Sequence, residues 1–243
     1  MTYDIQYSRF NDCSILIEWP SIIDDLILNN ILNFKNIIAK NYTKKNIEVI
    51  NTYNSILIIY PFIIQNINGE ILTLKTLFFK HGETQVYKST IWEIPVCYND
   101  EFGLDLEAFS DSKELSKTEI IRMHSEVIYT VFFIGFLPGF LYLGGLDSRL
   151  FLDRKITPNL NVKKGSVAIG GQQTGIYPQE SPGGWHCIGN APIALFNSNQ
   201  TPPCCIKAGD KVKFVPIEKP EHDDILNVLK TSEYQLKSTL THA

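Results

Sequence analysis

The sequence has little net charge and none of the long apolar runs that anchor a protein in a membrane. Its 243 residues carry a formal charge of −4 with a pI near 5.7. Phosphate binding needs a basic face, so nucleic acid is excluded as the main partner. No apolar run approaches the roughly 18 residues of a membrane span, and no basic segment followed by an apolar stretch opens the chain. We therefore expect a cytoplasmic protein with neither a membrane nor a nucleic-acid partner.

Cysteine is scarce and its spacing is uninformative. The five cysteines are odd in number and show no C-x-x-C pattern, which argues against both a disulfide framework and a zinc site. They lie at Cys13, Cys97, Cys187, Cys204 and Cys205. We expect reduced, buried thiols and no metal site.

The usual catalytic signatures are missing as well. The sequence has no G-x-S-x-G elbow, no H-E-x-x-H and no Rossmann fingerprint. GGQQTG is not a phosphate-binding P-loop, because no helix with a lysine and a serine or threonine follows it. The chain therefore indicates a binding surface more clearly than a self-sufficient catalytic centre, and it leaves open whether the protein is an enzyme.

Residues 1–91 alternate short β-branched runs with helical patterns, which predicts an α+β sandwich of ferredoxin-like character. Ser21 is positioned to cap the first helix, whose apolar residues recur at helical spacing. The predicted elements are a strand at 15–19, a helix after Ser21, strands at 47–50 and 56–60, and a helix between 61 and 80. The stripe of the first helix comprises Ile23, Ile27, Ile31, Phe34 and Ile38.

Residues 92–220 read as a second, mainly β domain, and residues 221–243 as a short helical tail that is loose past about Lys237. One helix in this domain is well marked, because Ser116 and Glu119 form a capping box. Its buried stripe is predicted to comprise Ile120, Ile121, His124, Val127 and Ile128. The turn Gly209-Asp210 leads into the last barrel strand.

The segment from Gly135 to Gly189 contains short strand runs separated by glycine and proline corners, as in a compact all-β barrel. Glycines beside large flat rings are typical of a ligand-binding or partner-binding surface. The aromatic corners are Phe136, Phe140, Tyr142, Tyr177 and Trp185.

The run SPGGWHCIG is the sharpest local signal. Pro182 stiffens the approach, and Gly183 and Gly184 permit positive φ angles or outward backbone amides that hold an anionic oxygen. Trp185 then supplies a stacking face. The alternative is a tight barrel corner with a core tryptophan. In GGQQTG, only one of Gln172 and Gln173 is expected to face inward.

His124 allows two interpretations. A histidine can act as an acid–base group at neutral pH, yet on an apolar helix face a hydrogen-bonded core histidine is more common. In the second case the neutral ring would hold a neighbouring loop such as 181–185 in place.

Three motifs in order, GFLPGFLYLGGLD, GSVAIGGQQTGIYP and SPGGWHCIG, resemble the KipI/PxpB family. That family is also called allophanate hydrolase subunit 1 and matches the carboxyltransferase C–D segment of urea carboxylase. Similar segments are FNDCSILIEW, VINTYNSILIIY and IPVCYNDEFGLDL, so the resemblance covers about residues 3–217.

The resemblance implies a cyclophilin-like barrel after a small α+β domain. It also implies a subunit that works with a larger carboxyltransferase-like subunit together with a lactam-utilisation subunit. The three form an ATP-dependent 5-oxoprolinase, with ATP at the level of the complex. Alternatives are a regulatory protein that inhibits a sensor histidine kinase, and a subunit of an allophanate- or urea-processing amidohydrolase.

The site residues follow from the motifs and the resemblance together. The family carries a His-Ser pair at His124 and Ser125, which makes His124 the catalytic candidate. The family's Arg-Thr is replaced by Asn190-Ala191, which leaves Arg154 and Arg149 as possible anion clamps. The substrate- or partner-binding candidates are Phe136, Pro138, Gly139, Phe140, Tyr142, Arg154, Gln172, Gln173, Tyr177, Pro182, Gly183, Gly184 and Trp185.

Overall fold

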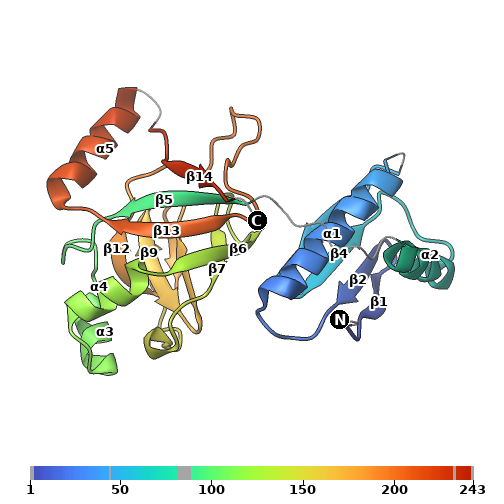
Figure 1. Cartoon of the computed structure of the whole chain (residues 1–243), viewed down its shortest axis with the longest axis horizontal. Coiled ribbons are helices and arrows are strands. Elements are labelled where there is room, and N and C mark those ends of the chain that lie inside the picture. The colour runs from blue at the N-terminus through green and yellow to red at the C-terminus, as the bar shows by residue number, and fades with distance from the viewer. Residues whose placement is uncertain (1–2, 44, 81–88, 232–233, 242–243) are drawn as a thin grey trace. The chain divides into compact units, whose positions relative to one another are not determined.

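The structure of the chain, a computed structural model, describes residues 3–43, 45–80, 89–231 and 234–241. The chain divides into two units, residues 1–87 and 88–242, which are described separately (Figure 1). Within the described residues, no helix combines the length and the apolar character that a membrane span requires.

The first unit is an antiparallel sheet with strand order β1-β2-β4-β3 and two helices. The helices contact each other, α1 packs on β3 and β4, and α2 packs on β1. The elements are β1 (Gln6–Asn11), β2 (Ser14–Glu18), α1 (Asp25–Asn41), β3 (Glu48–Asn51), β4 (Ser55–Ile59) and α2 (Ile67–Lys80).

Side-chain caps determine where the two helices begin. The Asp24 carboxylate accepts hydrogen bonds from the backbone N–H groups of Leu26 and Ile27, at 2.8 and 3.0 Å, so α1 starts at Asp25. The predicted cap at Ser21 is therefore wrong. The amide oxygen of Asn66 accepts from the Gly69 N–H at 2.9 Å, and α2 starts after it. The predicted stripe of α1 is buried at Ile27, Ile31, Phe34 and Ile38, whereas Ile23 precedes the helix and is 42% exposed.

The first strand was not predicted. β1 is an edge strand whose side chains are mostly exposed, so its sequence shows no alternation of apolar and polar residues. With it, the element order is ββαββα, whereas the ferredoxin-like order is βαββαβ. The ferredoxin-like expectation is thus not met in chain order.

The second unit is built on an eight-stranded sheet with strand order β12-β9-β10-β7-β6-β13-β5-β14, beside a two-stranded ribbon of β11 and β8. Its first elements are β5 (Thr90–Val96), α3 (Leu106–Lys113), α4 (Lys117–Ser125), β6 (Ile128–Ile134), β7 (Leu141–Gly144) and the short helix η1 (Ser148–Leu150). The remaining ones are β8 (Asn159–Val162), β9 (Ser166–Gly170), β10 (Gln173–Ile176), β11 (Ser181–Gly183), β12 (His186–Asn190), β13 (Lys211–Pro216), α5 (Lys219–Thr231) and β14 (Ser238–Leu240).

Two backbone hydrogen bonds join distant strands of this sheet. Cys97, just after β5, donates to the Asn190 carbonyl at 2.8 Å, and Asn190 donates back at 2.9 Å. Asn190 is the last residue of β12. The eight-stranded sheet therefore curls round, so that β12, its first strand, meets the end of β5, its seventh. A core of apolar side chains fills the interior, including the fully buried rings of Tyr129 and Phe214.

Helix α4 confirms the predicted capping box. The Ser116 hydroxyl accepts from the Glu119 N–H, and the Glu119 carboxylate accepts from the Ser116 N–H at 2.9 Å. Ile120 and His124 are buried as predicted. Ile128 does not belong to the stripe, because it begins β6 and is 49% exposed.

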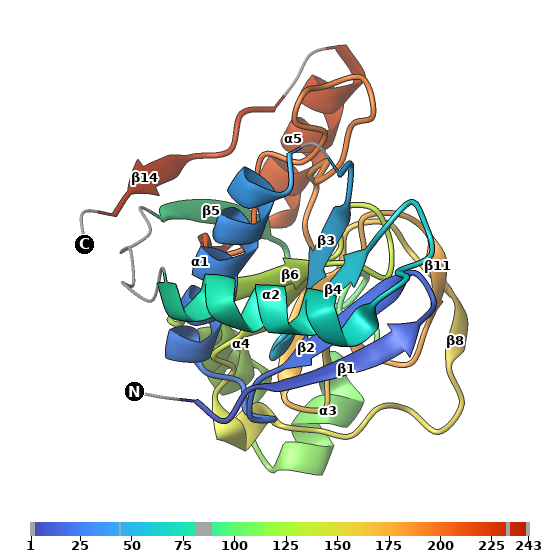
Figure 2. The same ribbon diagram turned by 90° about the vertical axis from the view of Figure 1, so that its right-hand side faces the viewer.

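The described part of the tail is ordered. After α5 the chain returns and pairs with β5 as the edge strand β14, with Ser238 opposite Trp92 (Figure 2). The loose end expected past Lys237 is therefore not observed in residues 238–241.

Candidate functional site

His124 lies in the core of the second unit, 0% exposed, with both ring nitrogens hydrogen-bonded. The Thr174 hydroxyl donates to the Ala168 carbonyl at 3.1 Å, so its oxygen accepts from His124 Nε2–H at 2.8 Å. Nδ1 then accepts from the Tyr98 hydroxyl at 2.8 Å. We call Tyr98, His124, Thr174 and Ala168 the buried polar chain.

The surroundings of His124 keep its ring neutral. The ring stacks on Phe214, with centroids 4.5 Å apart and planes 18° apart. Burial lowers the pKa of His124 to about 3, so it carries no charge at neutral pH. Both ring nitrogens are therefore occupied by groups of the protein itself. This position favours the core interpretation over the predicted catalytic one, with Thr174 as the partner in place of the expected loop 181–185.

The predicted aromatic corners come together in one cluster. Phe140 lies at its centre, and the ring centroids of Tyr142, Tyr177 and Trp185 lie 5.0, 5.5 and 5.6 Å from it. The rings meet at steep or tilted angles, as aromatic pairs prefer. We call these four residues the aromatic cluster. Phe140, Tyr177 and Trp185 are buried, with Trp185 only 5% exposed, so the cluster is a small core.

The glycines of the motifs make room for these rings. A Cβ atom at Gly170 would collide with the Trp185 indole, and one at Gly183 would collide with the Tyr177 hydroxyl. Neither Gly183 nor Gly184 has a positive φ angle, so the first of the two expected alternatives, positive φ, is not met. Gly183 belongs to the β11–β8 ribbon, and the Gly184 carbonyl accepts from the Lys155 N–H at 2.7 Å. Close packing against Tyr177 accounts for Gly183, whereas a Cβ atom at Gly184 would meet its neighbours only at ordinary van der Waals distances of 3.6 Å or more.

The cluster has an exposed rim, which we define as Phe136, Pro138, Arg154 and Pro182. Phe136 is 63% exposed, its ring lies 5.6 Å from Phe140, and its φ angle is +65°. A bulky residue with positive φ is strained, and such strain is concentrated at functional sites. Arg154 is exposed, so its charge lies at the surface. Its guanidinium lies 5.7 Å from the Trp185 ring centroid.

The other predicted residues lie elsewhere or serve packing. Gln172 is exposed in the turn before β10, and Gln173 is half-buried at the start of that strand. Gly139, with φ +86°, allows the chain to approach Phe196 closely.

Arg149 donates to Asp147 at 3.0 and 2.6 Å, which lowers the pKa of that carboxyl to about 2. Arg149 is thus paired already.

Sequence reasoning missed the groups that hold the site together. The Lys155 ammonium lies 2.6 Å from both carboxylate oxygens of Asp105, and Asp105 accepts from the Cys187 N–H at 2.7 Å. This fixes β12 beside the loop that carries Arg154. The partners are 50 and 82 positions apart in sequence, and no local pattern marks them. Across the described ranges, no group of three or more His, Cys, Asp or Glu could hold a metal ion.

We predict that acid destabilises the fold through His124. Between its ordinary pKa of 6.5 and the folded value of about 3, the unfolded chain binds a proton here and the folded chain does not. The free energy of unfolding therefore falls as the pH falls, by at most about 1.4 kcal/mol per pH unit. Urea melts over this range should show a shallower slope for His124→Gln than for the parent.

Two further variants complete this test. His124→Ala leaves the Tyr98 hydroxyl without its acceptor and Thr174 without its donor, and should lower the free energy of unfolding by about 1–3 kcal/mol, which Gln largely avoids. The pKa of His222 is also lowered by burial, so His222→Gln should flatten the slope as well and separates that contribution from the one of His124. Equal pH slopes for the parent and His124→Gln would contradict the buried neutral assignment.

We also predict that Trp185 supports folding more than binding. Trp185→Ala leaves a hole beside Gly170 and Phe140 and should lower the free energy of unfolding by about 3–5 kcal/mol, while Trp185→Phe should lose less. Chemical denaturation measures both. An Ala variant as stable as the parent that no longer binds a partner would instead place the ring in an interface.

Comparison with known proteins agrees with the motifs. The model of the carboxyltransferase domain, subdomains C and D, matches residues 5–206. The B subunit of 5-oxoprolinase from Bacillus subtilis (strain 168) is 47% identical over 132 residues, which cover 54% of this chain and 55% of the relative. That of Haemophilus influenzae is 53% identical over 123 residues, which cover 51% and 58%. The chain thus spans little more than half the length of these relatives.

A solved structure shows the same fold at low identity. The urea carboxylase of Kluyveromyces lactis superposes with a TM-score of 0.81 at 19% identity, and covers 99% of this chain and 24% of that one. The fold is therefore a mixed α/β fold with several sheets, similar to part of urea carboxylase. The family match over residues 5–206 shows that the chain belongs to the carboxyltransferase C–D domain family, and the identity to the two 5-oxoprolinase B subunits supports its assignment to the KipI/PxpB family within it.

Proposed function

We propose that the chain is a non-autonomous subunit of an ATP-dependent 5-oxoprolinase. In this reaction water breaks the lactam C–N bond of 5-oxoproline to give glutamate, and hydrolysis of ATP to ADP and phosphate supplies free energy. The observation that carries the proposal is the identity of 47% and 53% to two proteins named as the B subunit of 5-oxoprolinase. ATP-dependent chemistry and reduced cysteines suit a cytoplasmic location.

The side chains of this subunit support a shared site. His124 is buried and neutral, and the described residues hold no metal-binding group. An acid, a base and a phosphate-binding loop would then come from two partners, a larger carboxyltransferase-like subunit together with a lactam-utilisation subunit. In this scheme ATP is bound by the assembled complex, and we assign no ATP site to this chain.

The exposed rim of the aromatic cluster is the surface that we assign to the shared site. Phe136 offers an exposed ring held in place by a strained backbone, and aromatic anchors dominate binding at interfaces. Arg154 offers a cation at the same rim, suited to a carboxylate or phosphate. The curled sheet behind this rim supports a cyclophilin-like assignment of the second unit.

A second candidate is a subunit of an allophanate- or urea-processing amidohydrolase. The fold shared with urea carboxylase favours it, although at 19% identity the likeness concerns the fold alone. A third is inhibition of a sensor histidine kinase, for which the exposed Phe136 would serve equally well. Substrate assays separate the first two, and a kinase autophosphorylation assay tests the third.

We predict that the purified chain has no 5-oxoprolinase activity by itself and gains it only with both partner subunits and ATP. Its described residues provide no complete set of reacting groups, so turnover depends on the assembly. Glutamate formation measures the activity, with each protein omitted in turn as the control. ATP-dependent turnover by the isolated chain would rule out the shared-site scheme, and turnover of urea or allophanate alone would favour the second candidate.

We also predict that Phe136 acts at the interface. Phe136→Ala should weaken assembly with the partners by about 2 kcal/mol or more, because an exposed anchor is lost. Phe136→Gly should weaken assembly equally but fold more stably than the Ala variant by about 1 kcal/mol, since glycine tolerates positive φ. Calorimetry measures the affinity of assembly, and melts measure the stability of the fold. Exposed Leu160 gives a matched control, and Leu160→Ala leading to the same loss of assembly would contradict a specific role for Phe136.

A further inference from the structure

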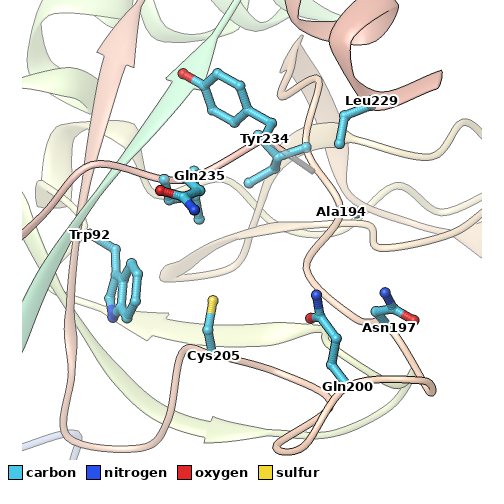
Figure 3. A pocket seen from close by; sticks show the side chains of 10 residues that line it. Trp92, Ala194, Asn197, Gln200, Cys205, Leu229, Tyr234 and Gln235 are labelled. Carbon is cyan, nitrogen blue, oxygen red and sulfur yellow. The ribbon is translucent and has the colours of Figure 1, made fainter. Parts of the chain in front are cut away.

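The second unit contains a cavity of about 460 Å³ that the aromatic cluster and its rim do not line. Its walls come from four segments: Trp92 on β5, the loop from Ile193 to Cys205, Leu229 on α5, and the chain from Tyr234 to Leu236. Figure 3 shows the Cys205 sulfur pointing into the space between Trp92 and Gln200. The volume lies within the range of small-molecule sites.

The walls combine apolar side chains with polar ones that carry no charge. Asn197, Gln200 and Gln235 line the cavity with amides and Cys205 lines it with a thiol, and none of the described lining residues carries a formal charge. An amide offers donors and an acceptor together, so it pairs with a group that does the same. A charged ligand would lose water here without meeting a counter-ion, which disfavours it.

The flat wall of the cavity is already fixed. The Trp92 indole N–H donates to the Asp210 carboxylate at 3.0 Å, and Asp210 is only 1% exposed. Asp210 also accepts from the backbone N–H groups of Thr90 and Lys207, at 3.2 and 3.1 Å. These bonds hold the indole of Trp92 in one orientation. They also occupy the Asp210 carboxylate with partners in the protein, so the surface that Trp92 offers a ligand is the apolar face of its ring.

The opposite wall depends on the returning tail. Gln235 and Leu236 line the cavity, and the next residue, Lys237, accepts a hydrogen bond from the Glu93 N–H at 3.0 Å. The strand β14 then pairs with β5. The tail therefore closes over the space, and a bound molecule would contact the loop and the tail at once.

We propose that this cavity binds a small, uncharged, planar ligand that carries a hydrogen-bond donor and acceptor side by side, such as a carboxamide on a flat ring. The ring packs on Trp92, and the carboxamide pairs with the Gln235 amide. The site does not rest on the proposed 5-oxoprolinase role. It discriminates by charge, since the matching carboxylic acid finds no cation among the lining residues that the structure describes.

Cys205 provides a direct readout in the full chain. Its thiol lines the cavity and is exposed, so iodoacetamide can alkylate it, and peptide mass spectrometry reports its rate beside that of Cys13 in the first unit. The probes are nicotinamide and nicotinate at millimolar concentrations, which share shape and differ in charge. Gln235→Leu keeps the volume and removes the amide, while Gln179→Leu, an exposed glutamine outside the cavity, is the matched control.

The proposal predicts that nicotinamide slows alkylation of Cys205, by about tenfold at ten times its dissociation constant, and leaves Cys13 unchanged. Nicotinate should give little protection. Gln235→Leu should reduce the protection severalfold and Gln179→Leu should not. Absence of protection by nicotinamide, equal protection by nicotinate, or full protection in Gln235→Leu would each overturn the proposal.

Discussion

The second unit depends on the buried polar chain that crosses its core. Tyr98 follows β5, His124 lies on α4, and Thr174 and Ala168 lie on β10 and β9, so three hydrogen bonds connect four elements. Each donor of the buried polar chain has a single acceptor. Losing one group would leave its partner unpaired, and an unpaired polar group in this interior lowers the stability of the fold. The chain of bonds is satisfied only by a neutral imidazole, and burial in this setting depresses its pKa to about 3.

His124 is therefore engaged in hydrogen bonds within the core, and the accessible groups of the unit lie at its surface. The rings that the motifs supply are largely buried, and at Gly170 and Gly183 these rings leave no room for a side chain. What remains accessible is Phe136, in a strained conformation, and the Arg154 charge above Trp185. An exposed aromatic anchor beside a cation suits a protein that contributes a surface to a shared site.

Local patterns predicted the local structure well. The capping box at Ser116 and Glu119 and most of the apolar stripe of α1 follow from spacing and residue type. The motifs supplied the aromatic corners, but not that Phe140, Tyr177 and Trp185 bury one another. Other features depend on contacts that spacing does not encode. Asp24 caps α1 although Ser21 was an equally suitable residue, and β1 is an exposed edge strand without alternation. The partners of His124 lie 26 and 50 positions away, and the cavity exists only once the tail has returned.

The most direct test of this account is the protonation state of His124 in the folded chain. Histidine-selective ¹⁵N NMR reports both the tautomer and the titration. The account predicts a neutral ring with the proton on Nε2, whose resonances do not titrate as the pH falls through the ordinary value of 6.5 toward about 3. A ring that titrates near 6.5, or that carries its proton on Nδ1, would contradict the buried polar chain and return His124 to the candidates for acid–base catalysis.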